Sequence, residues 1–160
     1  MKHFLSCILI CATSYGCKPD CQGEFTFTRA NVGDVGVAAI SRTENAWSAF
    51  SGKPGIVRFV EAKEIQEICH LTFVEKISYI NADENLIGFN FTFTNNIEVE
   101  IGNGSLELLH NILMHEVGHA LGLEHVNNSM SIMYEEIREN QYWTQDDQDE
   151  CESEGVCVAK

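Results

Sequence analysis

The chain has 160 residues, 44% of them hydrophobic, and a formal net charge of −14. This length suits one compact domain and is too short for two domains of ordinary size. The excess of negative charge argues against binding to nucleic acid or to anionic membrane surfaces. It also indicates a protein that would repel acidic substrates.

The first 16 residues have the features of an export signal. Lys2 gives a positive start, Phe4 to Ala12 form an apolar run, and Ser14-Tyr15-Gly16 provide small residues at its end. The run is too short to cross a bilayer as a helix. We therefore expect residues 1–16 to be a signal peptide, with an ordinary first strand as the alternative.

Seven cysteines are present, and five of them follow the expected signal. An odd count in an exported protein indicates a free or modified thiol. Cys17 directly follows the signal and loosely resembles the lipid-attachment cysteine of bacterial lipoproteins. Its lipidation would leave two disulfides, for which we predict the local pair Cys151 with Cys157 and the remaining pair Cys21 with Cys69. Secretion without a lipid anchor is the alternative.

Residues 17–23 are expected to be a tether. The pattern of apolar residues from 24 to 101 predicts a sheet, with one helix early in this stretch. Alternating or β-branched residues predict strands at 24–29, 56–60, 71–80, 86–94 and 97–101. Apolar residues at helical spacing predict a helix over 37–50, ended by Ser51-Gly52. The strand at 97–101 alternates as IEVEI, which indicates one face exposed to water.

The segment HEVGHALGLEH lies within a helical pattern that begins at Leu106. His115 and His119 are four residues apart, so on a helix they share one face with Cβ atoms about 5–6 Å apart. That arrangement suits two imidazole nitrogens on one zinc ion, and Glu116 between them can deprotonate a zinc-bound water. Gly122 can end the helix in a left-handed conformation. His125 can then return as a third ligand and leave one coordination position open, as in catalytic zinc sites. The alternative is a core helix whose histidines align by chance.

The acidic C-terminal region contains a second helix signal. Thr144 followed by acidic residues predicts a capped helix start. We interpret the charge run at 146–154 as a solvated face, with calcium binding as the alternative.

The long motif HExxHxxGxxH, followed by Ser131-Ile132-Met133-Tyr134, resembles the metzincin clan of zinc endopeptidases. Met133 lies eight residues after His125, a spacing similar to that of the matrixins. The resemblance implies an α+β zincin fold for residues 24–160. In that fold a twisted, mostly parallel sheet with an antiparallel edge strand lies over the active-site helix. A small C-terminal subdomain contains a methionine turn and a final helix.

The same resemblance implies roles for individual residues. It makes His115, His119 and His125 the zinc ligands and Glu116 the general base. Met133 is expected to pack beneath the histidines without binding the metal.

The resemblance also implies a substrate site. Tyr134 is expected to flank the specificity pocket. Ile97, Val99 and Ile101 are expected to form the edge strand that pairs with an extended substrate, and an edge strand without a ligand is the alternative. A segment at Cys17 to Asp20 faintly resembles the matrixin cysteine switch, although a tether is the favoured interpretation.

We expect an exported zinc endopeptidase, secreted or attached to the cell envelope, that acts as a monomer on protein or peptide substrates. The alternative from another class is an exported, zinc-binding surface lipoprotein without proteolytic activity. A calcium site is a further expectation from oxygen ligands. Its candidate ligands are Asp83, Glu84, Glu98 and Glu100. His70 and His110 stand alone and are expected to be ordinary core or surface residues.

Overall fold

The computed structural model describes residues 21, 23–64, 66–67, 69–74, 88–91, 96–100 and 105–159. The expected signal peptide and the lipidation candidate Cys17 lie outside these residues, as do Ile101, Asp83 and Glu84. Within the described part of the chain, no helix is both long enough and apolar enough to span a bilayer.

Five strands form one sheet in the order β2-β1-β3-β5-β4. The strands are β1 (Glu24–Phe27), β2 (Arg58–Glu61), β3 (His70–Val74), β4 (Gly88–Phe91) and β5 (Asn96–Glu100). β1, β2, β3 and β5 pair in parallel, and β4 pairs antiparallel to β5 at the edge of the sheet. The predicted α+β class, with a mostly parallel sheet and an antiparallel edge strand, is confirmed.

The prediction that the segment at 97–101 forms the edge strand was wrong. β5 lies between β3 and β4, so β4 forms this edge of the sheet and β2 forms the other. The alternation of IEVEI correctly indicated two different faces, but alternation does not distinguish an inner strand from an edge strand. Ile97 and Val99 are 0% exposed and pair with Leu71 and Phe73 of β3. They are core residues, and their expected role in substrate binding is withdrawn.

In the part of the chain that the structure describes, three helices accompany the sheet: α2 (Arg29–Ser51), α3 (Leu106–Leu121) and α4 (Gln145–Ser153). α2 begins eight residues earlier than the sequence predicted, and it crosses a kink at Gly33, where φ is 64°. Gly52 ends α2 in the left-handed conformation, with φ 70°, as expected for Ser51-Gly52.

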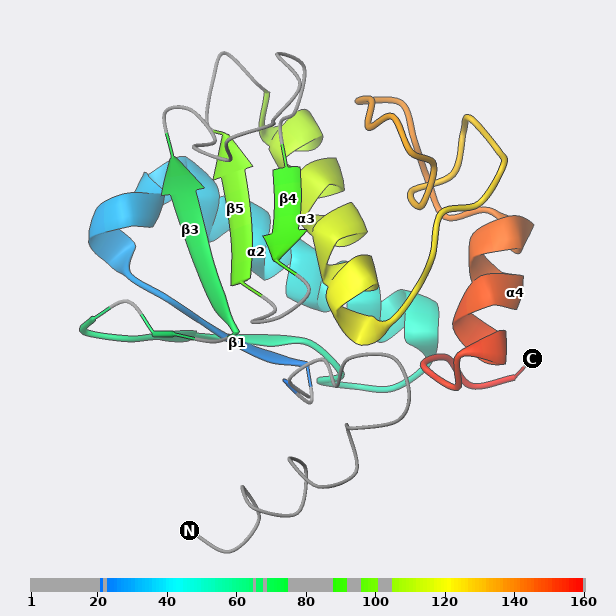
Figure 1. Cartoon of the computed structure of the whole chain (residues 1–160), viewed down its shortest axis with the longest axis horizontal. Helices are drawn as coiled ribbons and strands as arrows, with labels where there is room; N and C mark the ends of the chain where they lie inside the picture. The colour runs from blue at the N-terminus through cyan, green and yellow to red at the C-terminus, as the bar shows by residue number, and fades with distance from the viewer. Residues whose placement is uncertain are drawn as a thin grey trace, which may run out of the picture.

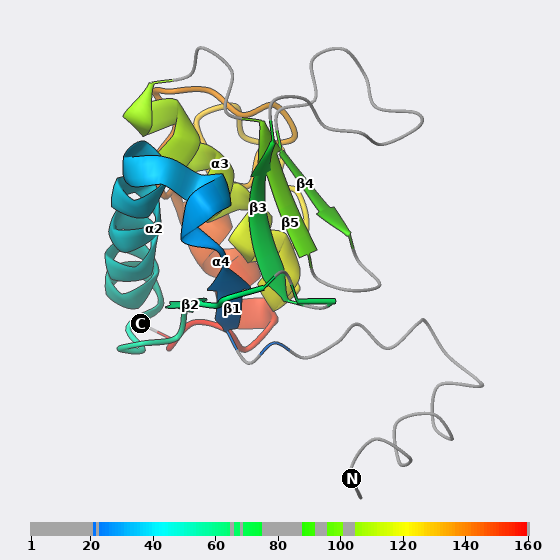
Figure 2. The same ribbon diagram turned by 90° about the vertical axis from the view of Figure 1, so that its left-hand side faces the viewer.

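α2 and α3 lie side by side on the same face of the sheet (Figures 1 and 2). Gly36 allows α2 to approach β3 closely, because a Cβ atom there would lie 2.1 Å from Cε2 of Phe73. Trp47 of α2 and Leu113 of α3 are both 0% exposed in the core between these layers. The sheet and α2 therefore fix the position of α3, the helix that contains the histidine motif.

Both predicted disulfides are present. Cys21–Cys69 links the segment before β1 to the residue before β3. Cys151–Cys157 closes a short loop across the end of α4. The pairing of the four cysteines that remain after Cys17 is confirmed.

Candidate metal centre

α3 begins with a side-chain cap. Ser105 is the N-cap residue, and its Oγ accepts a hydrogen bond from the backbone N–H of Leu108 at 3.1 Å. Glu107 places a negative charge in the first turn, which is favourable at the positive end of the helix dipole. The helix is buried continuously from Asn111 to Gly118, so the motif residues His115 and Glu116 are held rigidly within the core.

Gly122 ends α3 and redirects the chain, as the sequence predicted. Its φ is 107°, and its N–H donates to the carbonyl oxygens of Gly118 and His119. A non-glycine residue would be strained in this left-handed conformation. The turn returns His125 toward the helix, and the next residue is fixed by a 2.9 Å hydrogen bond from the N–H of Val126 to the carbonyl of Met133.

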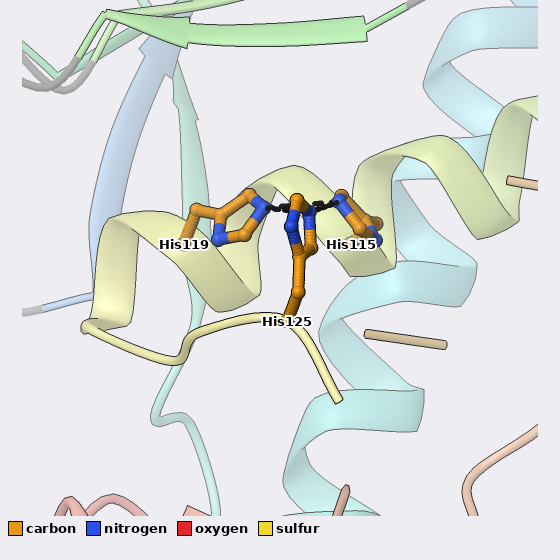
Figure 3. A group of neighbouring side chains, drawn as sticks. All are labelled: His115, His119 and His125. Carbon is orange, nitrogen blue, oxygen red and sulfur yellow. Dashed lines mark hydrogen bonds between the residues drawn. The ribbon is translucent and has the colours of Figure 1, made fainter. Parts of the chain in front are cut away.

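The Nε2 atoms of the three motif histidines converge on one point (Figure 3). The distances between them are 3.0 Å for His119 to His115, 3.1 Å for His119 to His125 and 3.3 Å for His125 to His115. Three imidazoles on a tetrahedral zinc ion, each with a bond of 2.0–2.1 Å, would place their nitrogens about 3.3 Å apart. The observed triangle is slightly tighter than this value and fits a zinc ion.

Hydrogen bonds on the opposite ring nitrogens determine which nitrogen faces the centre. Nδ1 of His115 donates to the carbonyl of Ile132 at 2.7 Å, and Nδ1 of His119 donates to the carbonyl of Leu123 at 2.9 Å. Burial, with smaller contributions from His119 and His125, lowers the pKa of His115 to about 3, even though the hydrogen bond to Ile132 opposes the shift. The neutral rings therefore direct Nε2 lone pairs at one another. A cation between them removes that repulsion and uses those lone pairs as ligands.

Glu116 follows His115 on α3 and is only 4% exposed. Burial raises the pKa of its carboxyl group to about 8 in the metal-free protein. A divalent cation bound to the neighbouring imidazoles would favour the ionised carboxylate. The residue type, position and burial suit a proton acceptor beside the metal.

Met133 packs directly against α3 at Gly118, which lies between His115 and His119 in the sequence. A Cβ atom on Gly118 would lie only 2.5 Å from Sδ of Met133, so glycine lets the methionine approach the helix between the ligands. Met133 is 0% exposed. The preceding residue, Ile132, provides the carbonyl that orients His115, so this turn contributes both packing and a ligand contact.

Asp147 is a structural residue of the site that the sequence did not reveal. It is 0% exposed, and its Oδ1 accepts hydrogen bonds from the hydroxyl of Ser131 and, at 3.0 Å, from the N–H of Met133. Its Oδ2 accepts from the N–H and hydroxyl of Thr144, at 2.7 Å and 2.9 Å. The predicted start of α4 at Thr144 is confirmed as a capping box. Asp147 joins that cap to the methionine turn.

Three other residues singled out in the sequence are not among the ligand candidates. Tyr134 is half-buried directly after the methionine turn, and its role at a specificity pocket stays a prediction. His70 is buried against Thr26, and His110 is hydrogen-bonded to Thr43, which agrees with their expected structural roles.

Calcium binding is not supported. Within the described residues, the three motif histidines are the group with ligand atoms close enough to hold a metal ion. The acidic run at 146–154 forms no such group there. Of the other four candidates, only the side chain of Glu98 is described, and burial raises the pKa of its carboxyl group.

A parallel sheet with an antiparallel edge strand, a helix bearing HExxH, a third histidine after a glycine turn and a methionine beneath them define a metzincin catalytic domain. Comparison with family models gives the particular family: residues 22–153 match the model described as Matrixin. The chain belongs to the matrixin family of zinc-dependent metalloproteases. A search of curated proteins finds no match.

Replacement of Asp147 by asparagine should destabilise the fold by about 3 kcal/mol, because a buried carboxylate with several donors would become an amide with a misplaced N–H₂ group. Denaturant unfolding measures the effect. Asp149→Asn, an exposed position on the same helix, is the matched control and should change stability by less than about 0.5 kcal/mol. Equal effects of the two substitutions would contradict the assigned role of Asp147.

Stability of the metal-free protein should depend on pH through Glu116. Because its pKa in the fold is raised from 4.5 to about 8, the fold is most stable with Glu116 protonated and loses stability as pH rises through this range. Glu116→Gln cannot ionise, so its advantage in Tm over the wild type, measured with a chelator, should grow from about pH 5 to about pH 8. Glu107→Gln, exposed on the same helix, should show no such growth. An advantage of Glu116→Gln that is constant with pH would exclude a buried titrating carboxyl group.

Proposed function

We propose that this protein is a zinc-dependent endopeptidase that hydrolyses peptide bonds of extended polypeptides, with His115, His119 and His125 as zinc ligands and Glu116 as general base. The observation that carries the proposal is the convergence of three Nε2 atoms at 3.0–3.3 Å, with a buried carboxyl group on the residue between two of them. Three protein ligands leave a position for water or substrate, which distinguishes a catalytic from a structural zinc site.

When bound, zinc supplies a Lewis acid that activates water and polarises the scissile carbonyl. Glu116 accepts the proton of the attacking water and returns it to the leaving nitrogen, as a general base and then a general acid. The carbonyls of Ile132 and Leu123 hold the rings of His115 and His119 in the tautomer that ligation requires. No covalent enzyme intermediate is needed.

The substrate is proposed to bind along β4. This strand is the antiparallel edge of the sheet and contacts α3, the helix of the histidines (Figure 1). The open side of an edge strand offers backbone donors and acceptors, so an extended peptide can add as a further strand. Tyr134, directly after the methionine turn, is proposed to flank the pocket for the substrate side chain.

The proposed setting is outside the cytoplasm, with residues 1–16 as signal peptide and Cys17 as the candidate for lipid attachment. Two disulfides are compatible with an extracellular protein. We propose that the protein acts as a monomer.

Glu116→Gln should retain zinc and lose about 10²–10⁴-fold in kcat on an unfolded protein such as casein, because proton transfer is removed and the ligands remain. Glu107→Gln, exposed in the first turn of α3, is the control and should cleave like the wild type. Metal content is measured in parallel. Substantial cleavage by zinc-loaded Glu116→Gln would refute the base assignment.

The alternative, a zinc-binding surface lipoprotein without proteolytic activity, predicts a different outcome of the same assay. The wild type would then hold zinc and leave unfolded proteins intact with or without chelator. A buried carboxyl group beside the ligands favours the peptidase, because a protein that only binds zinc has no use for such a base.

Substrate charge should also matter. Residues 105–159, which include the ligands and the methionine turn, contain twelve acidic residues and one basic residue, Arg138. Peptides with Lys or Arg near the cleaved bond should therefore have a higher kcat/KM than matched peptides with Glu, and this advantage should shrink as salt is raised. Matched fluorogenic peptides at several salt concentrations test this. A preference for the acidic peptides would contradict it.

A further inference from the structure

α4 contacts two segments that adjoin the proposed metal ligands. Asp147 holds the methionine turn that orients His115, as described above. Two other acidic residues of α4 hold the segment around His125. Oε1 of Glu150 accepts from the N–H of Glu124 at 3.0 Å, and Oδ2 of Asp146 accepts from Nδ2 of Asn128 at 2.6 Å. The position of α4 therefore affects two of the three ligands.

The helix itself has little apolar attachment to the rest of the protein. It has nine residues, QDDQDECES, and its buried residues are Asp147, Gln148 and Cys151. A helix this short is not stable by itself in water. The helix is held by the stacking of Trp143 on Phe50 just before its start and by one covalent attachment at its end.

The Cys151–Cys157 disulfide provides this attachment. Cys151 lies one helical turn after Asp147, on the same buried side, and is 0% exposed, while Cys157 is 6% exposed. The closed loop is joined to the end of α2 by a 2.9 Å hydrogen bond from the N–H of Val158 to the carbonyl of Ser51. Nζ of Lys53 also donates to the carbonyl of Gly155 at 2.8 Å. The disulfide thus ties the buried face of α4 to Cys157, and the next residue, Val158, is hydrogen-bonded to the end of α2.

We propose that the Cys151–Cys157 disulfide is a positioning element of the metal centre, which sets zinc affinity by keeping α4 against the methionine turn and the segment of His125. The proposal rests on zinc binding by the three histidines and is independent of peptidase activity. Among the described residues, Cys21–Cys69 shows no corresponding path to the histidines, because it joins the segment before β1 to the residue before β3.

The two disulfides therefore offer a matched comparison. Cys21–Cys69 spans 48 residues and Cys151–Cys157 spans 6. A disulfide that closes a longer loop restricts the unfolded chain more, so loss of Cys21–Cys69 should lower Tm more than loss of Cys151–Cys157. Zinc affinity should show the opposite order. C151A/C157A should weaken zinc binding by about tenfold or more, the size typical of lost support around metal ligands. C21A/C69A should bind zinc like the wild type.

Zinc affinity is measured by competition with a chromogenic chelator, on full-length protein. Both tryptophans of the chain report the docking of α4, because Trp143 stacks on Phe50 at 3.7 Å and contacts Trp47 at 4.9 Å between ring centroids. C151A/C157A should therefore also shift the tryptophan emission of the metal-free protein. A variant that folds only with zinc is tested from the loaded state, by its rate of zinc loss to excess chelator, which should be faster only for C151A/C157A.

Weakened zinc binding in C151A/C157A alone would support the proposal. Equal zinc affinity or equal rates of loss in the three proteins would overturn it, as would equal weakening in both variants, which would indicate general destabilisation. Failure of the wild type to bind zinc would instead overturn the proposed function, so the two failures are distinguishable.

Discussion

Two imidazole rings that have already donated their Nδ1–H groups to carbonyl oxygens must present bare Nε2 lone pairs to each other. In this protein His115 and His119 do so at 3.0 Å, and His125 adds a third nitrogen at 3.1 Å and 3.3 Å. Such an arrangement is repulsive without a cation and strongly binding with one. The surrounding structure supplies the constraints that keep the rings in place: the helix, the turn at Gly122, and the carbonyls of Ile132 and Leu123.

Two parts of the chain supply these constraints in different ways. The sheet and α2 bury one side of α3, and apolar packing there fixes the helix of the first two ligands. The part after α3 adds core residues such as Ile132 and Met133, but it also depends on specific polar contacts. In that part, one buried carboxylate, Asp147, joins the methionine turn to the start of α4. The candidate metal centre therefore lies between α3, which apolar packing fixes, and the segment after α3, which polar contacts and a disulfide hold in place.

The grouping of the three histidines could be predicted from the sequence, because it depends on spacings between residues that are close in the chain. The pair His115 and His119, the turn at Gly122 and the cap at Thr144 follow from helix geometry within a few residues. The position of β5 inside the sheet could not be predicted in this way, since strand order depends on pairing between distant segments. The same limit hid Asp147, whose acidic neighbours suggested a solvated helix start. Its partners Ser131 and Met133 lie 16 and 14 residues away. The early start of α2 was missed because Gly33 interrupts the helical pattern.

X-ray absorption spectroscopy at the zinc edge of the metal-loaded protein tests the central claim most directly. The account predicts three imidazole nitrogens and one further oxygen ligand from solvent, all at about 2.0–2.1 Å. It also predicts that His125→Ala changes this spectrum and weakens retention of the metal on dialysis. A sulfur ligand at about 2.3 Å, a fourth protein ligand, or a spectrum unaffected by His125→Ala would contradict it.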